Sequence, residues 1–261
     1  MSGRTSRESR RQAIEQARKA EAQRKRRRRL AAWGGAAVVL AGAGTGIGFA
    51  VSGGGSGAAS SASSAGSASY AALSTLGTLQ AAPSPGATGP EQVPIPDVQP
   101  LAGTSSATAG QAIDGISCQT SEQTIFHIHT HLTIFVNGQQ RQVPAGIGIP
   151  GAVAQQTSAG PFVDSGTCFY WLHTHAADGI VHIESPVQRT FTLGEFFDEW
   201  GQPLSASQVG PAKGKVSVIV NGKVWKGDPR NAPLGSRENL QLEVGTPLVA
   251  PETINWPVTG L

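Results

Sequence analysis

Apolar and polar residues alternate along several short segments in the second half of the chain. From Phe126 to Val136 every second residue is apolar except Thr130, so a β-strand here has one apolar face and one face with histidines. The dipeptides Asn137-Gly138 and Asn221-Gly222 each separate two such segments and predict the type I′ turns of β-hairpins. Residues 168–185 predict a further hairpin, and residues 239–245 predict a last strand.

One helix is predicted at residues 193–200, because apolar residues recur there with helical spacing. Thr192 and Glu195 fit a capping box at its start, and Gly201 fits the residue that ends it. The apolar face consists of Leu193, Phe196, Phe197 and Trp200.

Hairpins around one helix indicate an α+β fold made mostly of antiparallel β-hairpins. The predicted topology is a β-grasp-like ββαββ core, with the hairpin of residues 168–185 inserted. On the helix, Asp198 and Glu199 are interpreted as a solvent-exposed face and not as a catalytic carboxylate pair. The domain is expected to span residues 115–250, followed by a C-terminal tail at 251–261.

The N-terminal part has the pattern of a membrane anchor. Residues 30–51 form an uncharged, apolar segment that is long enough to span a bilayer as a helix. Residues 1–30 contain 12 of the 20 Lys and Arg residues but only 3 of the 17 Asp and Glu residues. This asymmetry predicts a single-pass plasma-membrane protein, with residues 1–29 in the cytoplasm and the C-terminal domain outside. Cleavage of the apolar segment as a signal peptide is the alternative, and it also leaves the domain extracytoplasmic.

Charge and composition also bear on partners. The net charge of +3 comes from the basic tail, so it gives no indication of nucleic-acid binding. Residues 52–114 are rich in Gly, Ser, Ala, Pro and Thr, which predicts a flexible linker between membrane and domain. The glycines of residues 42–48 have the spacing of paired transmembrane helices, so a homodimer through this helix is a further hypothesis.

The chain has two cysteines, Cys118 and Cys168. A lone pair of cysteines outside the cytoplasm favours a disulfide. The bridge would close a loop of about 50 residues and contribute on the order of 4 kcal/mol in the chain-entropy model. In the competing interpretation Cys168 is a metal ligand near His173, but strand alternation places these two side chains on opposite faces.

All six histidines of the chain lie between residues 127 and 182. Side chains two residues apart on a strand share a face and lie roughly 6.5–7 Å apart. Two imidazoles at this spacing can lean onto one ion, whereas three in a row extend too far. The histidines of the first strand, His127, His129 and His131, are therefore expected to give one or two ligands and to need partners from elsewhere.

The hairpin of residues 168–185 offers such partners. A two-residue turn at Asp178-Gly179 would place His175 opposite His182, whereas a four-residue loop would place His173 there. Both registers put four ligand-type side chains on one face of the hairpin: His173, His175, His182 and Glu184.

These histidines and Glu184 predict a transition-metal site. Imidazole and carboxylate ligands favour zinc or cupric copper, since the cysteines are expected to be paired and the sole methionine is Met1. The first hypothesis is a membrane-tethered domain that binds the ion. The second is a metal-dependent hydrolase or lyase with Glu184 as general base, so whether the protein is an enzyme stays open. The third is a metal-free interaction domain with a pH-sensitive histidine face.

Four blocks lie within residues 120–245: "HIHTHLTIFVNG", "VPAGIGI", "CFYWLHTHAADGIVHIESP" and "FTLGEFFDEWG". In these blocks the chain resembles an uncharacterised family of bacterial and archaeal membrane-anchored envelope proteins. The resemblance implies an extracytoplasmic location and no particular activity. An acidic residue often follows the "HTH" block in that family, where this chain has Ala176.

Overall fold

The computed structural model describes residues 70–104 and 110–261. The predicted cytoplasmic tail (1–29) and transmembrane segment (30–51) lie outside these residues. Among the residues described, no helix combines the length and the apolar character needed to cross a bilayer. The described part of the chain is mostly β-strands in several sheets with few helices, so the predicted α+β class is confirmed.

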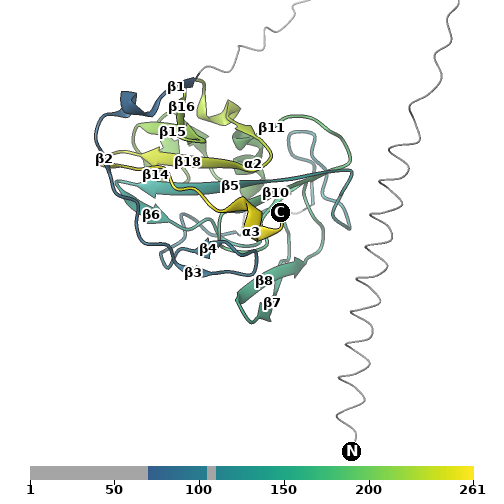
Figure 1. Cartoon of the computed structure of the whole chain (residues 1–261). Coiled ribbons are helices and arrows are strands. Elements are labelled where there is room, and N and C mark those ends of the chain that lie inside the picture. Colours follow the sequence, from purple (N-terminus) through teal and green to yellow (C-terminus); the bar gives the residue numbers. More distant parts are fainter. Residues whose placement is uncertain (1–69, 105–109) are drawn as a thin grey trace, which may run out of the picture. The chain divides into compact units, whose positions relative to one another are not determined.

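The largest sheet is built around two long parallel strands, β5 and β18, which run side by side in Figure 1. The N-terminal half of β5 pairs antiparallel with β10, and its C-terminal end pairs with β6. In spatial order the strands are β1 (Tyr70–Ala72), β16 (Lys223–Trp225), β15 (Val216–Val220), β18 (Glu238–Val244), β5 (Phe126–Val136), β10 (Ile180–Ser185) and β9 (Leu172–His173), with β6 (Gln139–Arg141) beside the end of β5.

Both Asn-Gly dipeptides form the predicted hairpin turns. Asn137 and Gly138 connect β5 to β6 with φ values of 50° and 74°. Asn221 and Gly222 connect β15 to β16 with φ values of 47° and 74°. Positive φ at both central residues defines a type I′ turn, which asparagine and glycine adopt at low cost.

Helix α2 (Leu193–Trp200) begins and ends where the sequence predicts. The Thr192 side chain accepts a hydrogen bond from the Glu195 backbone, the Glu195 carboxylate accepts one from the Thr192 backbone, and Gly201 ends the helix in a left-handed conformation. The apolar face is fully buried, as predicted.

The prediction that Glu199 lies on a solvent-exposed face of α2 is wrong, because this residue is fully buried. Strand β9 packs beside the helix, and the Leu172 backbone donates a hydrogen bond to the Glu199 carboxylate. Burial raises the pKa of Glu199 well above its ordinary value. Asp198 is only partly buried and forms an ion pair with Arg230.

One apolar cluster joins α2 to the inner face of the sheet. Leu132 and Ile134 of β5 and Val181 and Ile183 of β10 belong to it. Because side chains alternate along a strand, the residues between them point to the opposite face. That opposite face of β5 and β10 carries the histidines.

The folded part of the chain begins earlier than expected. The predicted linker over 52–114 is wrong for residues 70–104, because β1 extends the main sheet and further short strands pair within this segment. Strands of two or three residues have too few positions to display a period, and β1 and β2 pair with segments that are far away in the sequence. These strands and their partners are β2 (Leu79–Gln80) with β19 (Leu248–Val249), and β3 (Ala87–Thr88) with β4 (Pro94–Ile95).

The C-terminal residues are not a separate tail, in contrast to the expectation for 251–261. Trp256, in helix α3 (Trp256–Thr259), is buried against Val93 and Ile180. The Arg237 guanidinium donates two hydrogen bonds to the Leu261 carbonyl, of 2.9 and 2.6 Å. The C-terminus and the loop that contains Val93 are therefore held against the start of β10.

The predicted disulfide between Cys118 and Cys168 is present, with 5.5 Å between the Cα atoms. Next to it, Gln119 and Phe169 exchange two backbone hydrogen bonds. The bridge thus joins the segment before β5 to residues 168–175, which carry two of the histidines.

Smaller elements complete the described residues. They are the hairpin of β7 (Val153–Thr157) and β8 (Gly160–Ser165), the pair of β11 (Phe191–Thr192) and β17 (Pro233–Leu234), the three strands β12 (Leu204–Ser205), β13 (Gln208–Val209) and β14 (Ala212–Lys213), and the 3-10 helices η1 (Leu73–Leu76) and η2 (Pro229–Asn231).

Candidate metal centre

Three neighbouring strands bring most of the predicted ligands together on one face. Strand β10 lies between β5 and β9, so His182 is opposite His129 on one side and His173 on the other. Glu184 is opposite His127. The pairing of His173 with His182 is the register predicted for the longer hairpin loop. The sequence did not indicate which strand lies next to this hairpin, and the structure places β5 beside β10.

His173 and His175 point their Nε2 atoms at each other across 3.2 Å. His173 Nδ1 is 2.8 Å from the Tyr170 carbonyl oxygen, and His175 Nδ1 is hydrogen-bonded to the Val163 carbonyl oxygen. A carbonyl oxygen only accepts, so both Nδ1 atoms must donate. In the neutral rings both Nε2 atoms therefore carry lone pairs, and these lone pairs face each other.

Two facing lone pairs repel each other, and a cation between them would relieve this repulsion. A proton is a poor candidate here, because burial, together with the neighbouring histidines, lowers the pKa of His173 well below its ordinary value. Burial likewise lowers the pKa of His175. The pair is thus held in the neutral form that binds metal ions, with each Nδ1 fixed by a carbonyl oxygen.

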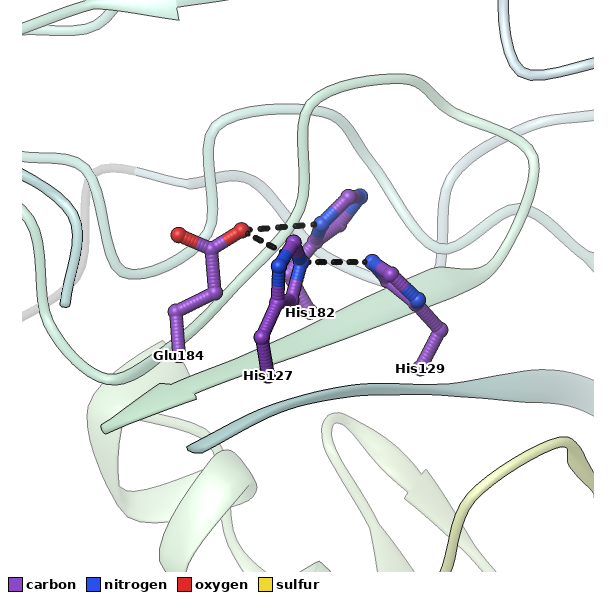
Figure 2. Close-up of side chains that lie close together, drawn as sticks. All are labelled: His127, His129, His182 and Glu184. Atoms are coloured by element: carbon purple, nitrogen blue, oxygen red, sulfur yellow. Dashed lines mark hydrogen bonds and ion pairs between the residues drawn. The ribbon is translucent and has the colours of Figure 1, made fainter. Parts of the chain in front are cut away.

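A second group of ligand atoms lies over β5 and β10, as Figure 2 shows. His127 Nε2 is 2.9 Å from His129 Nε2 and 2.9 Å from Glu184 Oε1. The His182 ring stands beside them, with Nδ1 3.4 Å from the same carboxylate oxygen. Burial, together with the neighbouring histidines, lowers the pKa of His129 to about 3, so its ring is neutral at pH 7.

His182 occupies the middle of the cluster, between two carboxylates. Its Nε2 atom is 2.7 Å from Glu91 Oε1, and its Nδ1 atom faces Glu184. Burial alone would lower the pKa of His182, but the hydrogen bonds with Glu184 and Glu91 outweigh it and raise the pKa to about 9. The proton on His182 therefore balances the buried carboxylates and occupies a position that a metal ion can take over.

Glu91 is a site residue that the sequence did not reveal. It lies in the loop between β3 and β4, within the segment expected to be a flexible linker, yet only 7% of its surface is exposed. Val93 holds the loop in place by packing on Ile180 and Trp256. The only signal in the sequence was that acidic residues are rare in this segment. Residues 52–114 contain three of them, Glu91, Asp97 and Asp114.

Glu122 is a second carboxylate that the sequence did not indicate. Its Oε1 atom is 3.5 Å from His175 Nε2, and about a third of its side chain stays exposed (36%). Partial burial raises the pKa of Glu122, helped by repulsion from Glu184. Glu122 lies just after Cys118, so the disulfide sets the position of this carboxylate relative to the histidine segment.

His131 does not join either group of ligand atoms, in contrast to its prediction as a ligand. Its Nε2 atom is 3.0 Å from the Asp178 carbonyl oxygen at the hairpin turn. Burial lowers the pKa of His131 to about 4, although this hydrogen bond partly offsets the effect. The residue is opposite Ile180, two residue pairs farther along the strands than the pair of His129 and His182.

The remaining six predicted ligands form two overlapping groups of four, and within each group all ligand atoms lie within 4.8 Å of one another. One group is His127, His129, His182 and Glu184; the other is His173, His175, His182 and Glu184. Imidazole nitrogens and carboxylate oxygens at such separations could hold a metal ion. The cysteines are excluded as ligands because they form the disulfide.

Comparison of this chain with family models, with curated proteins and with solved structures yields no match. The resemblance of its histidine blocks to an envelope-protein family therefore stays a prediction.

Proposed function

We propose that the domain binds a transition-metal ion between His173 and His175, with His182 and Glu184 completing the ligand set. The observation that carries this proposal is the pair of Nε2 lone pairs that face each other at 3.2 Å while both Nδ1 atoms donate to carbonyl oxygens. Metal-binding histidines typically donate their second nitrogen in this way, which fixes the tautomer and aims the ring.

We propose zinc as the ion, with cupric copper as the alternative. Two nitrogens bound to one tetrahedral zinc ion at 2.0–2.1 Å are about 3.3 Å apart. The observed separation of 3.2 Å agrees with this value. The available donors are imidazoles and carboxylates, which both ions accept. A cuprous ion is disfavoured because neither thiolate nor thioether lies in the cluster.

Capture or sensing of the ion fits the geometry better than hydrolysis. A catalytic zinc site keeps one position open to substrate. Here His173, His175, His182 and Glu184 are each at most 5% exposed. Glu184, the predicted general base, already has its Oε1 atom engaged by His127 and His182. No observation favours the metal-free, pH-sensitive interaction domain over metal binding.

The location of the domain is a further part of the proposal. We propose that residues 30–51 anchor the protein in the plasma membrane, with the basic residues 1–29 in the cytoplasm. The apolar segment and its charged flank support this orientation. The disulfide is consistent with it, because disulfides persist in oxidising, extracytoplasmic compartments. A tethered metal site outside the membrane would meet ions before they enter the cell.

For the fold we propose a β-grasp-like core. Support comes from the strand order, in which β5 and β18 are central and parallel, β6 and β10 flank β5, and β15 flanks β18. Helix α2 lies between the first hairpin and the last strands in the sequence, as a ββαββ order requires.

Elemental analysis of the full chain, purified in detergent without an affinity tag, tests the metal proposal. We expect zinc or copper to copurify with the protein, or to bind stoichiometrically when the metal-free protein is dialysed against the ion. The physical reason is that binding relieves the repulsion between the two Nε2 lone pairs and neutralises the buried carboxylates. Folded protein that retains no zinc or copper after loading with either ion would contradict the proposal.

A further inference from the structure

A second pair of histidines repeats the geometry of the first on the other side of β10. His127 and His129 are two residues apart on β5, and their Nε2 atoms converge to 2.9 Å. His173 and His175 are likewise two residues apart, and their Nε2 atoms converge to 3.2 Å. Each pair therefore offers two nitrogens close to the separation of about 3.3 Å that two ligands of one tetrahedral zinc ion have.

One ion does not serve both pairs. Within each ligand group all ligand atoms lie within 4.8 Å of one another, and among the described residues no such group combines a histidine of β5 with His173 or His175. Ligands of a single zinc ion lie at most about 4.2 Å from one another, twice the bond length. The ligand atoms accordingly fall into two groups that overlap only at His182 and Glu184, the two ligands of the middle strand.

Glu184 can bridge the two metal positions, because it belongs to both ligand groups. Its Oε1 atom is 2.9 Å from His127 Nε2, and in Figure 2 the carboxylate is directed toward the rings of His127 and His182. Its Oε2 atom is buried and has no hydrogen-bond partner among the described residues. A carboxylate has lone pairs on both oxygens, so it can bind one ion through each. Two-metal centres with ions about 3.5–4 Å apart are bridged in this manner.

From these contacts we infer that the domain holds a second metal ion, bound by His127, His129 and Glu184. The face of β5, β10 and β9 then carries a two-ion centre in which Glu184 is shared. This inference rests on the proposed function, because the first ion is the one between His173 and His175. The second ion is bound by the same kinds of ligand as the first, imidazole and carboxylate. It explains why the two histidines of β5, His127 and His129, converge.

The two positions differ in access to solvent. The His127 side chain is 38% exposed, whereas His173 and His175 are at most 5% exposed. A chelator can therefore approach the second ion directly but has to wait for the domain to open before it reaches the first. The second ion is expected to exchange with solution and the first to be retained.

Titration of the metal-free full chain with cobalt(II), followed by visible absorption, tests the inference. We expect saturation at two equivalents per chain in the wild type. The His127→Ala/His129→Ala double variant should saturate at one equivalent, because it keeps the complete first group. His131→Ala is the matched control, since it removes a buried histidine of the same strand that lies outside both groups, and it should retain two equivalents.

The outcomes separate this inference from the proposed function. Saturation of the wild type at one equivalent would overturn the second ion, and the first would stand if the His127→Ala/His129→Ala variant still binds that one equivalent. A double variant that takes up two equivalents would also overturn the second ion. No cobalt binding at all would overturn both. If the double variant fails to fold, chelator exchange of the wild type decides: two phases of equal amplitude support two ions, and a single phase of one equivalent overturns the second.

Discussion

The double substitution His173→Ala/His175→Ala is expected to lower the affinity of the first position for zinc by at least about a thousand-fold. The variant loses both converging Nε2 atoms, which are two of the four ligands in that group. Structural zinc sites bind with apparent free energies of about 10–16 kcal/mol, so losing half of the ligands removes more than the roughly 4 kcal/mol that a thousand-fold change represents. Competition with a chromophoric chelator measures this affinity on the full chain.

His131→Ala is the control for this experiment. His131 is buried and lies on the same face of β5 as two of the ligands, but its Nε2 atom is hydrogen-bonded to the Asp178 carbonyl oxygen. The control should keep the wild-type affinity for zinc even if it loses stability, and circular dichroism verifies that each variant is folded. A His173→Ala/His175→Ala variant that is folded and binds two equivalents as tightly as the wild type would disprove the assigned ligands.

Removal of the disulfide in a Cys118→Ser/Cys168→Ser variant is expected to lower the free energy of unfolding by about 4 kcal/mol. The bridge spans 50 residues of sequence, so its loss enlarges the conformational entropy of the unfolded chain. Urea denaturation of the metal-free proteins measures the difference and keeps metal binding out of the comparison.

Ser121→Ala is the matched control, because Ser121 is an exposed residue of the same loop. Its unfolding midpoint should equal that of the wild type. The cysteine variant should also bind zinc more weakly, since the bridge connects the segment of Glu122 to the segment of His173 and His175. Identical unfolding midpoints for the wild type and the cysteine variant would refute a stabilising role of the bridge.

Local signals in the sequence predicted the elements that frame the site. Type I′ turns follow from the two Asn-Gly dipeptides, and the boundaries of α2 follow from Thr192, Glu195 and Gly201. Strand alternation placed the histidines on the face opposite the apolar core, which the structure confirms. Each of these signals involves residues within a few positions of one another, so the chain encodes them locally.

Local signals of this kind did not predict which strands lie next to each other, or in which register. Both hairpin registers put the same four side chains on one face, and the choice of His173 opposite His182 depends on packing that involves the whole sheet. The position of β5 beside β10 brings residues about 50 positions apart into register. Nothing in the alternation of either strand specifies its neighbour, because any strand of suitable length can pair with an edge.

Glu91 shows why composition misled the prediction of the linker. A Gly-, Ser- and Pro-rich segment buries little apolar surface of its own, which normally leaves it flexible. Here Val93 packs with Ile180 and Trp256, and short strands of the segment pair with strands of the domain. Contacts with residues far away in the sequence therefore order this segment. The ordered segment places the Glu91 carboxylate next to His182. Glu199 was misjudged for a similar reason, since β9 covers it.

Anomalous X-ray diffraction at the zinc edge, from crystals of the zinc-loaded full chain, tests most directly whether a metal ion lies between His173 and His175. We expect an anomalous peak about 2.0–2.1 Å from the Nε2 atoms of both residues. Zinc-loaded crystals in which these two Nε2 atoms bind no ion, and in which the anomalous peaks lie only elsewhere on the protein, would contradict it.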